Sequence, residues 1–201
     1  MVTMMKMPLF SNFHNTFEKY YSFIKVNKQV KIFLIGYMCS GKTTLGKQIA
    51  EKLNIPFIDL DREIERNSGK TITSIFQTDG EDSFRQIEKT EINKLIKTNN
   101  HFVMATGGGT PCYFNNMDIM KKNGLVIYLN VAVKELVRRN LESPETRPLL
   151  RGMNELEMLS FINEHLTSRL PYYKKANLTL KENDLDLDKI IQDIKLMTHS
   201  R

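Results

Sequence analysis

The stretch GYMCSGKT, residues 36–43, fits the pattern of a glycine, four residues and then Gly-Lys-Ser/Thr. It lies between the apolar run Val30–Ile35, which predicts a buried strand, and Lys42–Leu53, where apolar residues recur at helical spacing. In such a unit the backbone amides of the loop face phosphate groups, and the helix dipole favours their charge. The pattern predicts a nucleotide site. A glycine-rich turn without a ligand is the alternative, and this strand-to-helix context argues against it.

Two side chains of this loop have expected roles in binding ATP. Lys42 would reach the β- and γ-phosphates, and the Thr43 hydroxyl would ligate Mg²⁺. The other loop residues expected at the nucleotide are Cys39, Ser40, Gly41 and Thr44. The loop indicates that a nucleotide binds, but it does not identify the group that accepts a phosphoryl.

Short apolar runs and helical segments alternate on the C-terminal side of this loop. Further strands are expected at 57–59, 102–105, 125–129 and 178–180, and helices from 62 onward and at 81–98 and 187–197. This alternation predicts an α/β fold with a parallel sheet covered on both faces. Residues 141–158 form the one long polar connection, and a loop of that length is usually functional or mobile.

Composition limits the remaining possibilities. A chain of 201 residues fits one compact domain, expected over 29–201, with residues 1–28 as an extension of unknown role. Its net charge of +6 is spread among interleaved acids, so we expect no nucleic-acid partner, and no apolar run predicts a membrane span. Two cysteines are too few for a disulfide framework. We expect a cytoplasmic protein, acting as a monomer.

Two aspartates follow the second expected strand, at positions 59 and 61. Parallel sheets bind ligands at the carboxyl ends of their strands. One carboxylate there can hold magnesium through water, and the other can accept a hydrogen bond from an attacking hydroxyl. The alternative for either aspartate is to cap the next helix. The residues alone leave both interpretations open.

A charged pair opens the helix expected over 81–98. Arg85 and Glu88 are three residues apart, and hence neighbours on one face. The planar fork of an arginine suits a substrate carboxylate, and Glu88 could hold that fork in place. Taken alone, the pair favours an exposed helix salt bridge.

Three further features are candidates for ligand contacts. Gly107, Gly108 and Gly109 follow the third expected strand, and successive glycines indicate close approach of backbone to a ligand rather than a flexible turn. Arg147, in the long loop, suits closure over phosphates. Arg169, expected at the end of a helix, offers a second fork for a carboxylate or compensates the helix dipole.

Taken in order, six segments resemble the shikimate kinase family, and the resemblance runs from about Val30 to the C-terminus. They are GYMCSGKTTLGKQIAEKL (36–53), FIDLDREIE (57–65), GEDSFRQIE (80–88), ATGGGTPCYF (105–114), RPLL (147–150) and SRLPYY (168–173). The resemblance implies the nucleoside-monophosphate-kinase type of P-loop fold, three layers α/β/α with a five-stranded parallel sheet and a mobile lid near 141–158. It further implies transfer of the γ-phosphoryl group of ATP to the 3-hydroxyl of shikimate, with Mg²⁺, in aromatic amino acid biosynthesis.

The resemblance also implies roles for single residues. Asp61 would bind the reacting hydroxyl and act as, or substitute for, a general base. Arg85 and Arg169 would clamp the shikimate carboxylate, and the Gly108 amide would contact the ring hydroxyls. The remaining implied roles are Arg147 at the ATP phosphates, Asp59 supporting Mg²⁺ through water and Arg139 beside the adenine.

One residue departs from the family pattern. Cys39 stands where the family usually has a small residue, most often glycine. If this position has a positive φ, a cysteine there would cost about 1 kcal/mol or more. A thiol beside a helix start and Lys42 would also be open to oxidation, which makes the activity a candidate for redox sensitivity.

Two rival functions remain open at this point. One is another small-metabolite P-loop kinase, such as a gluconate kinase. The paired Arg85 and Arg169 and the triple glycine favour shikimate over gluconate. The other rival is a catalytically silent nucleotide-binding module, against which the presence of all the charged site residues argues.

Overall fold

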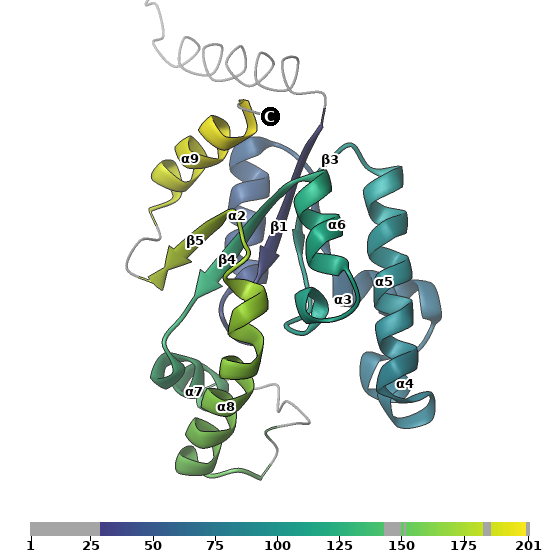
Figure 1. The fold of residues 1–201 in the computed structure, drawn as a ribbon, viewed down its shortest axis with the longest axis vertical. Coiled ribbons are helices and arrows are strands. Elements are labelled where there is room, and N and C mark those ends of the chain that lie inside the picture. Colours follow the sequence, from purple (N-terminus) through teal and green to yellow (C-terminus); the bar gives the residue numbers. More distant parts are fainter. Residues whose placement is uncertain (1–28, 143–149, 151, 183–185, 200–201) are drawn as a thin grey trace, which may run out of the picture.

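The computed structural model describes residues 29–142, 150, 152–182 and 186–199 (Figure 1). The expected extension, residues 1–28, lies outside these ranges. In chain order the elements are β1 (Val30–Ile35), α2 (Lys42–Leu53), β2 (Phe57–Asp59), α3 (Leu60–Ser68), α4 (Ile72–Thr78), α5 (Gly80–Thr98), β3 (His101–Ala105), η1 (Thr110–Cys112), α6 (Asn116–Asn123), β4 (Leu125–Asn130), α7 (Val133–Glu142), α8 (Glu155–Tyr173), β5 (Leu178–Lys181) and α9 (Leu187–His199).

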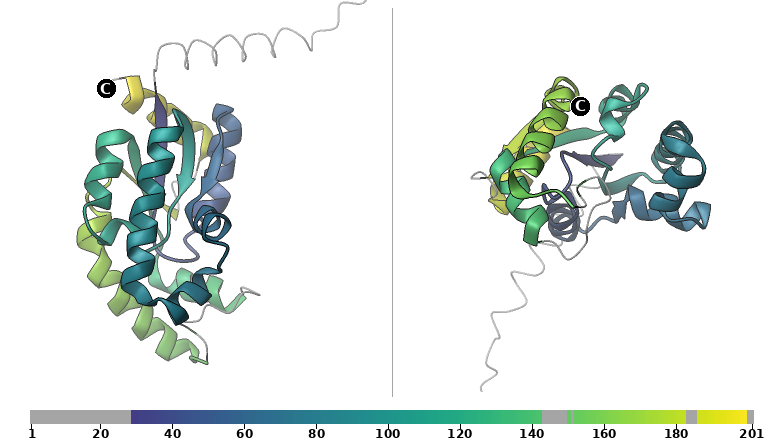
Figure 2. Two further views of the ribbon diagram at one scale, coloured as in Figure 1. Left: turned by 90° about the vertical axis from the view of Figure 1, so that its right-hand side faces the viewer. Right: turned by 90° about the horizontal axis from the view of Figure 1, so that it is seen from below.

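The strands form one parallel sheet of five in the order β2-β3-β1-β4-β5. Side chains of the central strand β1 alternate between two cores, with Phe33 and Ile35 in one and Ile32 and Leu34 in the other. Helices α5, α6 and α8 pack on the first face of the sheet, and α2 and α9 on the second (Figure 2). The three-layer α/β/α fold predicted from the sequence is confirmed.

Helix α3 begins earlier than expected, at Leu60 instead of residue 62. The cause is Asp59, whose Oδ1 accepts a hydrogen bond from the backbone N–H of Arg62 at 3.4 Å and so caps the helix. Asp61 consequently belongs to the first helical turn. Helix α4 has only seven residues, too few for a periodic pattern to show, and the sequence did not predict it.

The polar connection expected over 141–158 is shorter in the structure. Helix α7 extends to Glu142, and α8 begins at Glu155 behind a capping box in which Asn154 and Glu157 bond each other's backbone N–H groups. Residues 143–149 and 151 lie outside the described ranges, so the mobility of a lid there stays a prediction. None of the described helices is long and apolar enough to cross a membrane.

The position expected for Arg169 is wrong in one respect. Helix α8 continues through Pro171 to Tyr173, so Arg169 lies within the helix and does not end it. A proline near a helix end is tolerated when the backbone beyond it still finds partners, and the Lys174 N–H bonds to the Leu170 carbonyl at 2.9 Å. Dipole compensation by a terminal arginine therefore does not describe this residue.

The sheet brings three candidate ligand-binding segments to the carboxyl end of its strands. Ala105, the last residue of β3, pairs with Asp59 on one side and with Leu34 on the other. Because these strands are parallel, three segments follow their carboxyl ends at the same side of the sheet. They are the phosphate loop (residues 36–43), the two aspartates after β2 and the glycines after β3. Helices α4 and α5 stand on one side of this end of the sheet, and α7 and α8 on the other (Figure 1).

Candidate active site

The phosphate loop, residues 36–43, has the backbone of an anion cradle. Gly36 has φ 147°, and a Cβ there would lie 2.9 Å from the Leu129 carbonyl oxygen, so only glycine fits. Gly41, with φ 93°, precedes α2 and provides no side chain to cap it, and the first turn of α2 contains no acidic residue. The N–H groups at this helix start are thus suited to bind an anion.

The ammonium of Lys42 is held inside this loop. It donates to the carbonyl oxygens of Gly36 and Tyr37 at 2.9 and 2.7 Å, and lies 3.5 Å from the Ser40 hydroxyl oxygen. These contacts place a positive charge in the middle of the loop. This is the position expected for a lysine that binds phosphates, and a phosphate oxygen is a stronger acceptor than a carbonyl.

Thr43 and Asp59 meet beside the loop. The Thr43 hydroxyl donates to Asp59 Oδ2 at 3.1 Å, while Oδ1 of the same carboxylate caps α3. Asp59 therefore caps a helix and also faces the phosphate loop, the two interpretations that the sequence left open. A hydroxyl and a carboxylate are the hard oxygen ligands that Mg²⁺ prefers, and Mg²⁺ commonly completes its shell with water and phosphate oxygens. The residues present fit this ion.

Cys39 connects the loop to helix α7. Its φ is 57°, so the positive φ considered from the sequence is confirmed. The thiol donates to Asn140 Oδ1 at 3.3 Å, and Asn140 is itself fixed by a bond to the Leu136 carbonyl at 2.7 Å. Arg139 donates to the Cys39 carbonyl at 3.4 Å and also bonds Glu182. Arg139 thus borders the phosphate loop, and its place beside the adenine stays a prediction.

Gly107 lets two carboxylates approach the backbone after β3. A Cβ at this position would lie 3.1 Å from Asp61 Oδ1 and 3.0 Å from Glu88 Oε1. Asp61 reaches this place from the first turn of α3, where the helix dipole favours negative charge. A carboxylate is therefore present at the carboxyl edge of the sheet, where the sequence predicted an acceptor for a hydroxyl proton.

The next two glycines accommodate two arginines. A Cβ at Gly108 would lie 3.0 Å from Arg169 Nη1 and 3.5 Å from the Gly36 carbonyl oxygen, and a Cβ at Gly109 would lie 2.6 Å from Arg85 Nη2. The side chains predicted to bind the acceptor therefore gather around one glycine turn, in contact with the phosphate loop. This arrangement also explains why the turn needs glycines, since any side chain would displace a charged group.

Arg85 is held by two carboxylates and an aromatic ring. Its Nη1 donates to Glu88 Oε2 at 3.0 Å, and its Nε and Nη2 donate to Glu81 Oε1 at 3.2 and 3.0 Å. The guanidinium carbon lies 4.1 Å from the centre of the Tyr113 ring. Burial alone would lower the pKa of Arg85, but Glu88 and Glu81 raise it, so the charge is retained.

Glu88 is the buried centre of this network. It accepts hydrogen bonds from Arg85 and from the Thr110 hydroxyl, and its side chain is 0% exposed. Burial raises the pKa of Glu88, and the nearby Arg85 charge opposes that shift. Asn116 donates to the Thr110 carbonyl at 3.0 Å, which fixes the turn that carries Thr110. The fork of Arg85 is thus oriented from inside the protein, as the spacing of Arg85 and Glu88 suggested.

Arg169 lies over the ring of Tyr37. Its guanidinium carbon is 5.6 Å from the centre of the Tyr37 ring, and the Tyr37 hydroxyl shares a 3.1 Å hydrogen bond with His165 Nδ1. The Tyr173 hydroxyl donates to the Gly108 carbonyl at 2.6 Å. Burial raises the pKa of Tyr37 to about 12, so this phenol stays neutral at physiological pH. Tyr37 therefore joins the phosphate loop to helix α8.

Sequence reasoning missed side chains that hold the candidate site, among them two that contact Arg85, and it included one residue that the structure does not describe. Glu81 is four residues from Arg85, a helical ion-pair spacing that could have revealed it. Tyr113 lies on another segment, so no local pattern marks its contact with Arg85. Arg147 lies outside the described residues, and Thr44 is exposed in the first turn of α2.

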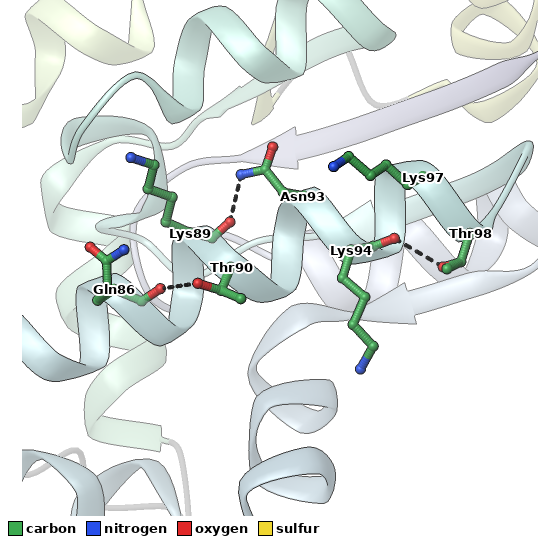
Figure 3. Close-up of a pocket in the computed structure, with 7 residues that line it drawn as sticks. All are labelled: Gln86, Lys89, Thr90, Asn93, Lys94, Lys97 and Thr98. Atoms are coloured by element: carbon green, nitrogen blue, oxygen red, sulfur yellow. Dashed lines mark hydrogen bonds between the residues drawn. The ribbon is translucent and has the colours of Figure 1, made fainter.

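A separate surface hollow lies along helix α5 (Figure 3). The side chains that line it come from this one helix and include no residue of the candidate site: Gln86, Lys89, Thr90, Asn93, Lys94, Lys97 and Thr98. Its lysines are partly engaged, since Lys94 pairs with Glu91 at 3.3 Å and the Lys89 ammonium lies 4.7 Å from the Phe114 ring centre. The hollow is therefore not part of the site described above.

Comparison with known proteins agrees with this geometry. A family model described as shikimate kinase matches residues 38–198. A shikimate kinase of Bacteroides thetaiotaomicron is 41% identical over 157 residues, which cover 78% of this chain and 89% of that protein. The family-model match thus includes residues 38–43 of the phosphate loop and every described residue assigned above to the acceptor side.

Solved structures show the same fold. A shikimate kinase from Acinetobacter baumannii, in complex with shikimate, gives a TM-score of 0.73 at 34% identity and covers 89% of this chain and 97% of that one. A gluconokinase from Sinorhizobium meliloti gives a TM-score of 0.53 at 16% identity, covering 87% of this chain and 94% of that one. At 16% identity the second likeness shows the fold alone.

Proposed function

Because this chain belongs to the shikimate kinase family, we propose that it transfers the γ-phosphoryl group of ATP to the 3-hydroxyl of shikimate, giving shikimate 3-phosphate and ADP. One observation carries the proposal. Asp61, Arg85 and Arg169 surround a glycine turn beside the phosphate loop, where a Cβ at Gly108 would lie 3.5 Å from the Gly36 carbonyl oxygen. An anionic hydroxy acid and a nucleotide would therefore be held side by side.

The acceptor side of the site suits a small anion with hydroxyl groups. Arg85 and Arg169 would bind its carboxylate, and the backbone between Gly107 and Gly109 would contact its ring hydroxyls. A guanidinium has five N–H donors, and the carboxylates of Glu81 and Glu88 occupy three of those on Arg85. These bonds hold the guanidinium in one orientation, and a bidentate carboxylate requires two donors on one edge of it.

Catalysis in this arrangement depends on positioning and charge. Asp61 would accept a hydrogen bond from the reacting hydroxyl, orient its oxygen toward the terminal phosphate and take up its proton. Lys42 and the N–H groups at the start of α2 would hold the phosphates. Magnesium, when held by Thr43 and Asp59, would supply charge neutralisation at the phosphate oxygens.

Further parts of the proposal concern residues at the margin of the site. Arg139 would flank the adenine, since its guanidinium reaches the Cys39 carbonyl. Arg147, on a lid near 141–158, would close over the ATP phosphates and exclude water. We also propose a single kinase domain over residues 29–201, an N-terminal extension over 1–28, and a cytoplasmic monomer without a nucleic-acid or membrane partner.

A coupled assay of ADP release tests the proposed reaction. The full chain, with Mg·ATP, should release ADP when shikimate is added, and shikimate 3-phosphate should appear in equal amount by mass spectrometry. Parallel assays with gluconate and without any acceptor serve as controls. Turnover of gluconate without turnover of shikimate would assign the protein to the rival kinase class, and ATP binding without any phosphorylated product would identify a silent module.

Replacing Arg169 by alanine should weaken acceptor binding. A charge-assisted hydrogen-bonded contact contributes about 1.5–3 kcal/mol, so we expect the KM for shikimate to rise roughly 10- to 150-fold. The KM for ATP should change little, because Arg169 faces the glycine turn and the Tyr37 ring. Steady-state kinetics with each substrate varied in turn will measure both values. An unchanged KM for shikimate would remove Arg169 from the site.

Alkylation of Cys39 should inhibit turnover. A carbamidomethyl group would enlarge a side chain that already contacts Asn140 at the rim of the phosphate loop. Burial raises the pKa of Cys112 to about 11, so this second thiol should react slowly. Iodoacetamide is expected to inactivate the wild type and the Cys112→Ala variant but to spare Cys39→Gly. Full turnover of a wild-type sample shown by mass spectrometry to be modified at Cys39 would refute thiol sensitivity.

A further inference from the structure

The carboxylate of Glu81 is hydrogen-bonded to the guanidinium of Arg85 in this structure. Its Oε1 accepts hydrogen bonds from Nε and Nη2 of Arg85 at 3.2 and 3.0 Å, and from the Tyr113 hydroxyl at 2.8 Å. The Arg85 side chain is only 8% exposed, because Gly109, the Tyr113 ring and two carboxylates surround it. A ligand carboxylate can therefore reach the full fork of Arg85 only if one of these groups moves away.

Of the two carboxylates on Arg85, Glu81 is the one that can leave. The Glu88 side chain is 0% exposed and also accepts a bond from Thr110, so moving it would leave a buried charge without its partner. The Glu81 side chain is 50% exposed in the first turn of α5 and can rotate into water, where its charge is solvated. The Tyr113 hydroxyl and Arg85 hold the pKa of Glu81 below its usual value, so the departing group is an anion.

We propose that Glu81 is an internal competitor of the acceptor, a carboxylate that the acceptor's own carboxylate replaces on Arg85. The inference rests on the proposed function and adds a specificity-determining residue to it. When Glu81 turns away, Arg85 loses an anionic partner, and a ligand carboxylate can take the place of that partner. A neutral polyol cannot, so Arg85 stays paired with Glu81 and the site discriminates against it.

The substitution Glu81→Gln tests this exchange. Glutamine keeps the size of the side chain, but its neutral oxygen holds a guanidinium less strongly than a carboxylate does. Removing a half-exposed ionic competitor should lower the Kd for shikimate about threefold to fivefold, the scale expected for a solvent-accessible ion pair. Isothermal titration calorimetry of the full chain with shikimate measures this Kd, and titration with ATP should give an unchanged value.

Asp82→Asn is the matched control. Asp82 is exposed in the same helical turn and makes no side-chain hydrogen bond or ion pair with the described residues, so this variant makes the same change of net charge without touching Arg85. Its Kd for shikimate should stay within twofold of the wild type. An equal fall in both variants would show a general charge effect and overturn the proposal.

Other outcomes are equally decisive. An unchanged or raised Kd in a folded Glu81→Gln variant would mean that Glu81 supports Arg85 and does not compete with the ligand. If that variant does not fold, Tyr113→Phe removes the second donor to Glu81 and should lower the Kd in the same direction, whereas a raised Kd would contradict the exchange. Failure of the wild type to bind shikimate would refute the proposed function, a result distinct from these.

Discussion

Replacing Asp61 by asparagine will lower kcat for shikimate phosphorylation by about 10²- to 10⁴-fold, the usual contribution of a positioned general base. The amide keeps the shape of the side chain and still accepts a hydrogen bond, but it cannot take up the proton of the attacking hydroxyl. Asp61 lies beside Gly107, where a Cβ would come within 3.1 Å of its Oδ1. The loss should therefore appear in kcat more than in the KM for ATP.

Glu63→Gln is the control for this substitution. Glu63 lies in the same helix and pairs with the exposed Arg66, so its loss makes the same change of net charge, and such a pair contributes little. Its kcat should match that of the wild type. In Asp61→Asn the melting temperature should fall by a few degrees at most, because the helix-dipole contribution is about 0.3–1 kcal/mol. A kcat within threefold of the wild type would exclude proton transfer to Asp61.

The order of the elements could be predicted because it follows from local sequence patterns. The same patterns predict that ligands bind at the carboxyl end of the sheet. An apolar run predicts β1, and helical periodicity after the glycines of the phosphate loop predicts α2. Both elements have the predicted bounds in the structure. Parallel strands then require that the segments after β1, β2 and β3 emerge together. The strand topology therefore predicts that Asp61 lies close to the phosphate loop.

Contacts between distant segments could not be predicted in the same way. Tyr113 packs on Arg85, and the Tyr37 hydroxyl meets His165 across 128 residues of chain, which no local period encodes. The early start of α3 depends on one capping bond from Asp59, and a pattern of apolar residues does not resolve a cap of that kind. Sequence motifs indicated the candidate side chains, whereas packing determines which partners hold them in place.

Removing the buried carboxylate of Glu88 is expected to destabilise the protein strongly. Glu88→Ala leaves the guanidinium of Arg85, itself 8% exposed, without its interior partner and leaves the Thr110 hydroxyl without an acceptor. Removing one partner of a buried ion pair lowers the free energy of unfolding by about 3–5 kcal/mol. For a chain of this size the melting temperature should fall by roughly 6–20 °C. Thermal and urea unfolding followed by circular dichroism will measure the loss, and a fall below about 3 °C would contradict it.

A double substitution separates the structural from the functional role of the pair. Buried ion pairs replaced on both sides by apolar residues of similar volume often recover their stability. Arg85→Met combined with Glu88→Leu should regain at least half of the free energy of unfolding lost in Glu88→Ala, yet bind shikimate no better than that variant. Recovery of stability without recovery of affinity would mean that the pair is there to present a guanidinium to the acceptor. If the double variant were as unstable as Glu88→Ala, the charges themselves would be holding α5 to the glycine turn.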